Sequence, residues 1–185
     1  MDTSTRARLA LPWQEEPEVT EHADQFLIRR ADPADIGHLV EFRAVMMSEM
    51  GEDVDADPSW RDDAAAWFAR RMKDESTFAA FVACAAEPPD AGPVGCAVGT
   101  IDDHAPSPRN RHGLRGEIAN VVTAPEFRGR GLARACVSAL LTWFTDETAA
   151  TTVRLTATAD GESLYRALGF TDPRDRILQA RLTRP

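Results

Sequence analysis

The 185-residue chain has no apolar run that approaches the roughly 18 residues a membrane-spanning helix needs. No apolar segment follows Arg6 and Arg8, so the sequence lacks the pattern of a secretory signal. Its three cysteines, Cys84, Cys96 and Cys136, are an odd number at wide spacing, which is typical of reduced thiols and not of a disulfide framework. We therefore expect a cytoplasmic protein with no membrane partner, whose cysteines are buried as small hydrophobic side chains.

Positive charge is also scarce, because 21 Lys and Arg stand against 30 Asp and Glu, for a formal net charge of -9. No run of basic residues stands apart from acidic neighbours, so we expect no nucleic-acid partner. No spacing of Cys and His resembles a metal site, so no metal is expected. The composition leaves the oligomeric state open, a homodimer included.

The length and the 43% hydrophobic content fit one domain. Residues 1–24 combine prolines with acids and show no period, so they are expected to form an N-terminal leader to a domain at 25–185. Apolar periodicity predicts an α/β (α+β) fold of order β-α-α-β-β-β-α-β-α-β, with a mixed, mostly antiparallel twisted sheet and helices on both faces. The expected strands are 26–30, 77–86, 94–101, 114–123, 153–158 and 177–182, and the expected helices are 33–50, 58–72, 132–144 and 162–168.

The most informative stretch, Glu117 to Ala133, is a strand that runs into a glycine-rich turn opening a long helix. Gly129 and Gly131 permit unusual dihedrals and a close approach of the backbone, and the first N–H groups of the helix have no partner within it. Together with the helix dipole, these groups form a cradle for an anion. Three neighbouring arginines favour a phosphate or pyrophosphate as that anion: Arg128, Arg130 and Arg134.

The turn admits other interpretations. The glycines could simply make a tight strand-to-helix turn while the arginines lie in solvent. A mononucleotide P-loop would require Gly, four residues and then Gly-Lys-Ser/Thr, and a dinucleotide fingerprint would require Gly-x-Gly-x-x-Gly early in a βαβ unit. The sequence contains neither nucleotide pattern.

The turn Arg128-Gly-Arg-Gly-Leu-Ala133 resembles the Arg/Gln-x-x-Gly-x-Gly/Ala motif of the GCN5-related N-acetyltransferase (GNAT) superfamily. The preceding Thr123-Ala-Pro-Glu-Phe-Arg-Gly is similar to the family's strand-to-helix entry, and Leu164-Tyr-Arg-Ala-Leu-Gly-Phe170 is similar to its late Leu-Tyr-x-x-Leu-Gly-Phe signature. The element order agrees as well, so the resemblance covers nearly all of the chain outside the leader.

The resemblance implies an acyl-CoA-dependent N-acyltransferase with acetyl-CoA as the acyl donor. In the family, the backbone across the glycine turn holds the pyrophosphate of coenzyme A. The strand before the turn pairs with the pantetheine arm and directs one N–H at the thioester carbonyl, where it would also stabilise an oxyanion. The implied cofactor-binding residues are Val121, Val122, Thr123, Arg128, Gly129, Arg130, Gly131, Leu132, Ala133 and Arg134.

Two residues are candidates for proton transfer. Tyr165, the single tyrosine of the chain, occupies the position where many family members place the acid that protonates the coenzyme A sulfur; alternatively, its ring packs under the sheet. Glu117 lies on the strand that meets the thioester, at a spacing that resembles the glutamate base of histone-modifying members. Its alternative is an edge glutamate paired with Arg115 or Arg154.

In this family the link between the first two helices commonly walls the acceptor pocket, and here residues 49–63 contain seven acids and one base. Such a segment would attract a cationic amine, so the expected acceptor is a small-molecule primary amine, attacking directly in a ternary complex. The acids could equally be a solvated loop of an acidic protein. A non-catalytic acyl-CoA-binding sensor or assembly partner with the same fold remains the alternative function.

Overall fold

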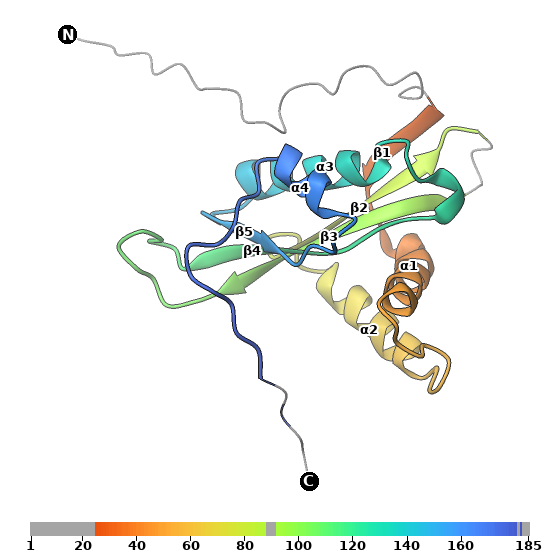
Figure 1. Ribbon diagram of the computed structural model, residues 1–185, viewed down its shortest axis with the longest axis horizontal. Coiled ribbons are helices and arrows are strands. Elements are labelled where there is room, and N and C mark those ends of the chain that lie inside the picture. The colour runs from red at the N-terminus through yellow and green to blue at the C-terminus, as the bar shows by residue number, and fades with distance from the viewer. Residues whose placement is uncertain (1–24, 88–91, 181, 183–185) are drawn as a thin grey trace.

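The centre of the molecule is a five-stranded sheet with its strands in sequence order, as the computed structural model shows over residues 25–87, 92–180 and 182 (Figure 1). The first four strands form an antiparallel meander, and the fifth pairs in parallel with the fourth. The strands are β1 (Phe26–Arg30), β2 (Phe78–Ala85), β3 (Pro93–Asp103), β4 (Leu114–Thr123) and β5 (Val153–Leu155).

Helices cover both faces of the sheet, so the predicted architecture is confirmed (Figure 1). On one face, α1 (Ile36–Glu49) and α2 (Trp60–Arg71) bury a core around Leu39, Phe68 and Val82. On the other face, α3 (Leu132–Asp146) and α4 (Glu162–Ala167) bury a second core around Leu140 and Trp143. None of the helices that the structure describes is long and apolar enough to cross a membrane.

The entry to α1 is fixed by a capping box and by one buried carboxylate. Asp32 accepts a hydrogen bond from the Ala34 N–H, Asp35 reaches back to the Asp32 N–H, and Pro33 begins a short 3-10 turn (Pro33–Asp35) that leads into the helix. Asp35 is 4% exposed and accepts two hydrogen bonds from Arg29, of 2.6 and 2.8 Å. Burial by itself would raise the pKa of Asp35. The hydrogen bonds and the charge of Arg29 help to outweigh this effect, so the pKa of Asp35 lies below its usual value. The pair fastens the start of α1 to β1.

A bulge in β4 divides the strand into two halves. The register against β3 shifts between Cys96 and Val98, and the Asn120 backbone on the opposite strand has a φ of 49°. Only the first half of β4 pairs with β5, whose last registered pair is Ile118 with Leu155. The second half of β4 therefore has one edge that no strand of the described chain covers.

Several predicted details are wrong. The expected last strand at 177–182 is absent from the described residues, where Ile177 and Leu178 are 71% and 89% exposed. The strand expected at 153–158 ends at Leu155, because its pairing with β4 ends there. Cys84 is partly exposed, whereas Cys96 and Cys136 are buried as expected. The expected leader, residues 1–24, lies outside the described residues.

Candidate active site

The glycine-rich turn opens α3 without any side-chain cap. Gly131 is the N-cap residue and has a left-handed φ of 78°, and Gly129 has a φ of 75°. A Cβ at either position would meet no atom within 4 Å, so the backbone dihedral and not space calls for glycine there. The first N–H groups of α3, those of Leu132, Ala133 and Arg134, receive no side-chain cap and have no partner within the helix. The turn thus presents donors and the positive end of a helix dipole to an anion.

Two of the three arginines of the turn have side-chain contacts that hold it in place. Arg128 donates to the Thr123 carbonyl at 3.1 Å and forms an ion pair with Glu49, the last residue of α1. Arg130 lies over the rings of Phe26 and Phe127, with its guanidinium carbon 5.8 and 5.4 Å from their centres. These contacts tie the turn to α1 and to β1.

The free half of β4 lies next to this turn. The Ala124 N–H donates to the Val94 carbonyl at 2.8 Å, so the backbone of Ala124 faces β3. Because successive residues of a strand alternate, the backbone groups of Thr123 and Val121 face the opposite edge, beyond the end of β5. Val122 lies between them and packs its side chain in the α1 and α2 core. The uncovered N–H groups therefore belong to two of the three positions that the family resemblance assigns to pantetheine.

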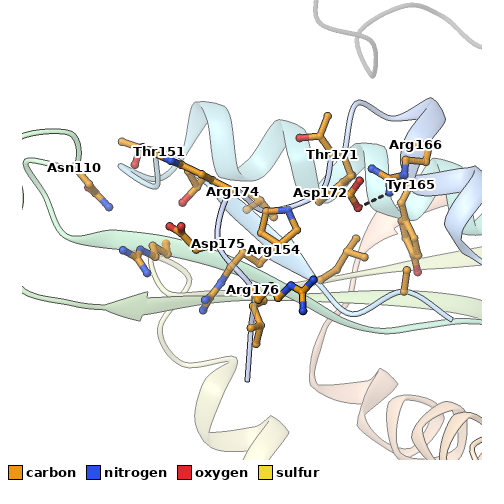
Figure 2. A pocket seen from close by; sticks show the side chains of 18 of the residues that line it. Asn110, Thr151, Arg154, Tyr165, Arg166, Thr171, Asp172, Arg174, Asp175 and Arg176 are labelled. Carbon is orange, nitrogen blue, oxygen red and sulfur yellow. Dashed lines mark hydrogen bonds and ion pairs between the residues drawn. The ribbon is translucent and has the colours of Figure 1, made fainter. Parts of the chain in front are cut away.

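Tyr165 projects from α4 toward the sheet (Figure 2). Tyr165 is 8% exposed, and its ring packs edge to face against Phe170 with 6.0 Å between the ring centres. Gly161 lies so close that a Cβ added there would be 3.1 Å from the Tyr165 ring. Burial raises the pKa of Tyr165 above its usual value, so the phenol keeps its proton at neutral pH. The residue also lines a cleft of about 970 Å³ beside β5.

Glu117 forms a loose ion pair with Arg154 on β5, at 3.5 Å, and the same guanidinium lies 3.6 Å from Asp102. Glu117 and Arg154 are registered neighbours of the parallel strands, so the pair follows directly from sheet geometry. The Glu117 side chain is 38% exposed, which makes it more accessible to water than its mid-strand position suggests. The edge ion pair that the sequence offered as an alternative is present, with Arg154 as the partner, and the role of Glu117 as a base stays a prediction.

The contacts that hold the β4 bulge could not be predicted from the sequence. Asn120 is 5% exposed, and its side-chain oxygen accepts a hydrogen bond of 2.9 Å from Arg43 of α1. Its carbonyl accepts a hydrogen bond of 3.2 Å from the Cys96 thiol of β3. The sequence shows only a polar Asn within an apolar strand segment. Arg43 lies 77 residues away, and nothing in the sequence around it indicates the contact.

Several acids of the link between α1 and α2 already form hydrogen bonds or ion pairs with residues of the same segment. Asp53 accepts from the N–H groups of Asp55 and Ala56, and Arg61 lies 3.4 Å from Asp55. Asp57 accepts from the Ser59 hydroxyl and N–H, and these hydrogen bonds hold the pKa of Asp57 below its usual value. Within the described part of the chain, no three Asp, Glu, His or Cys side chains are grouped to hold a metal ion.

The family model of the acetyltransferase (GNAT) family matches residues 39–170, more than two thirds of the chain. The chain therefore belongs to the GNAT family of acetyltransferases. It is an N-acetyltransferase with acetyl-CoA as its acyl donor, as the turn and its flanking motifs predicted. The uncapped glycine turn and the uncovered edge of β4 fit the pyrophosphate and pantetheine of that donor.

Solved structures share the fold. A predicted acetyltransferase of Clostridium acetobutylicum, solved with acetyl-CoA, is 22% identical with a TM-score of 0.72 and covers 84% of this chain and 96% of its own. A GCN5-related N-acetyltransferase of Ralstonia eutropha is 21% identical with a TM-score of 0.70, covering 84% and 98%. An aminoglycoside acetyltransferase from an uncultured soil metagenomic sample, in complex with sisomicin, is 11% identical with a TM-score of 0.65, covering 88% and 99%. No curated protein matches the chain significantly.

Proposed function

We propose that the chain acetylates the primary amine of a small acceptor that is cationic at its reacting nitrogen, by direct attack in a ternary complex. The observation that carries the proposal is the placement of an uncapped helix N-terminus beside an uncovered strand edge. Acetyl-CoA supplies an activated acyl group as a thioester. The chain's own contribution is to bind this donor, to orient it and to move protons.

The donor would be held by the turn and by the free half of β4. The N–H groups at the start of α3 would bind the pyrophosphate, assisted by the positive end of the helix dipole. The backbone of Val121 and the N–H of Thr123 would bind the pantetheine arm as a strand partner does, because these groups face the edge that β5 leaves uncovered. The Thr123 carbonyl instead accepts from Arg128. A fixed N–H at this edge would also stabilise the negative charge that develops on the acyl oxygen.

Proton transfer would involve Tyr165 and Glu117. The neutral amine forms the new C–N bond, the C–S bond breaks, and the sulfur takes a proton from the Tyr165 hydroxyl, whose proton is retained because the residue is buried. The nitrogen loses its proton to Glu117, directly or through a water molecule that the exposure of this carboxylate admits. The acids of the link at residues 49–63 would attract the ammonium form of the acceptor.

The proposal is tested in two steps on the full chain. Acetyl-CoA should raise the melting temperature, and the rise should continue with the logarithm of its concentration above the dissociation constant. A panel of primary amines should then release coenzyme A thiol from acetyl-CoA in an acceptor-dependent manner. Stabilisation by acetyl-CoA with no thiol release across a broad panel would instead support a non-catalytic acyl-CoA sensor, and no stabilisation at millimolar acetyl-CoA would overturn donor binding itself.

A further inference from the structure

A second feature of the molecule is the cleft beside the outer edge of β5. Its volume is about 970 Å³, within the range of roughly 300 to 1,000 Å³ typical of small-molecule sites. Five parts of the chain line it together: the start of β4, β5 with its flanking residues, α4, the loop around Asn110 and the C-terminal segment 170–177 (Figure 2). Tyr165 forms part of the wall, so the cleft reaches the residue assigned above to proton transfer.

The cleft is rich in arginine although the chain as a whole has a net charge of -9. Its lining includes six arginines and three acids. Arg166 already pairs with two of these acids, Glu162 at 3.1 Å and Asp172 at 2.6 Å, and Arg154 pairs with Glu117 and Asp102. Among the described residues, the other four arginines of the lining have no ion pair, and neither has Asp175, the third acid. These four are Arg109, Arg115, Arg174 and Arg176.

Neutral hydrogen-bond donors accompany this positive charge. The Thr152 carbonyl accepts from the Gly116 N–H of β4 at 2.8 Å, so the backbone of Thr152 faces inward. By the alternation of a strand, the N–H groups of Val153 and Leu155 face outward into the cleft, where the described chain provides no further strand. Thr151 and Thr171, whose side chains carry hydroxyl groups, line the same cleft. Arginine forks and N–H groups are the donors that carboxylates and phosphates prefer.

We propose that this arginine cleft binds an anionic group of the acceptor, so that the acceptor is a small molecule carrying a carboxylate or a phosphate in addition to its primary amine. The inference rests on the proposed function, because it places the amine end of the acceptor at the Tyr165 side of the cleft. The arginines bind the anion of the acceptor. The acids of the link at residues 49–63 attract its ammonium group before that group loses a proton. The cleft thereby selects amines with an anion over simple alkylamines.

A binding experiment tests the cleft without knowledge of the acceptor. The full chain, saturated with acetyl-CoA so that the pyrophosphate turn is filled, is titrated with inorganic phosphate and separately with succinate, at constant ionic strength set by chloride. We expect one of the two anions to raise the melting temperature with the logarithmic concentration dependence of binding at one site. The anion with the larger effect identifies the phosphate or the carboxylate as the preferred group. In the double variant Arg174→Gln, Arg176→Gln the apparent affinity should fall roughly tenfold.

Arg111→Gln is the matched control, because Arg111 is exposed, lies in the loop beside the cleft and does not line it. This control should bind phosphate and succinate as the wild type does. An equal response of the double variant and the wild type would overturn the proposal, as would the absence of any stabilisation beyond that of chloride.

A kinetic experiment then separates this inference from the proposed function. Coenzyme A release is compared for pairs of amines of equal length, one ending in a methyl group and the other in a carboxylate or a phosphonate. The anionic member should have the lower KM in the wild type, and the double variant should remove that preference. If both members are turned over with equal KM, the proposed binding of an anion in the cleft would be overturned, while the proposed acetyl transfer would stand. No turnover of any amine would count against the proposed function instead.

Discussion

Arg43 of α1 donates a hydrogen bond of 2.9 Å to the side chain of Asn120 at the bulge of β4. The bulge is the point at which β4 leaves β5, and the uncovered groups of Val121 and Thr123 follow it directly. The hydrogen bond between α1 and β4 therefore helps to fix the edge of β4 that is assigned to pantetheine. The Cys96 thiol holds the same residue from β3, through the Asn120 carbonyl.

Substitutions of Asn120 should separate its side-chain bond from its backbone conformation. Asn120→Gly keeps the φ of 49° without strain but loses the bond to Arg43, whereas Asn120→Ala loses the bond and also places a Cβ in a left-handed conformation. We expect both variants to be less stable than the wild type, with the alanine variant lower than the glycine variant by about 1 kcal/mol. Chemical denaturation of the two variants measures this difference, and equal stabilities would show that the φ of Asn120 stores no strain.

Gly131→Ala should weaken both the fold and the binding of acetyl-CoA. The φ of 78° at this N-cap is costly for alanine, by about 1 to 2 kcal/mol, and relaxation of the turn would move the N–H groups at the start of α3. The matched control is Gly37→Ala on α1, where an added Cβ also meets nothing within 4 Å but no left-handed φ is involved. Calorimetry should show a lower affinity for acetyl-CoA in Gly131→Ala alone, and thermal melting should show no loss of stability in Gly37→Ala. Equal acetyl-CoA affinities in the two variants would contradict the assigned role of the turn.

The fold could be predicted from sequence wherever local signals bounded an element. The bounds predicted for β1 and β4 are those observed, because Asp32 with Pro33 closes the first strand and Pro125 closes the other. The strand expected at 177–182 fails for a different reason. Its alternating apolar residues resemble a strand, but a strand exists only where another edge pairs with it, and the described chain gives Ile177 no such partner.

Some features of the candidate site could likewise be predicted from the sequence, and others could not. The turn from Arg128 to Arg134 could be predicted because its glycines and its helix are contiguous in sequence. The partner of Glu117 could be narrowed to two arginines, and the register of β4 with β5 chooses Arg154. The Arg43 contact and the arginine cleft could not be predicted, because each joins segments brought together only by the fold.

Tyr165→Phe should lower turnover by roughly 10²-fold, since general acid catalysis typically contributes 10² to 10⁴. The change removes only a hydroxyl from a ring packed against Phe170, so acetyl-CoA affinity and melting temperature should change little. Burial raises the pKa of Tyr165 above the usual tyrosine value, so deprotonation of this group should reduce wild-type turnover only at a higher pH than for an exposed tyrosine. Steady-state rates of thiol release from pH 6 to 10 measure both effects. A wild-type rate in the variant would remove Tyr165 from the mechanism.

Glu117→Gln separates a base from an edge ion pair, because the two roles predict different pH profiles. If Glu117 accepts the proton of the amine, turnover should fall most at low pH and recover partly at high pH, where more of the amine is already neutral. If it serves only to pair with Arg154 at 3.5 Å, the loss should be small and equal at every pH, since an exposed pair contributes about 0 to 1 kcal/mol. Asp102→Asn is the matched control, because Asp102 lies 3.6 Å from the same guanidinium and is assigned no part in proton transfer. Rates of thiol release across the pH range for both variants decide the matter: a profile shared by Glu117→Gln and Asp102→Asn would assign Glu117 to the ion pair alone.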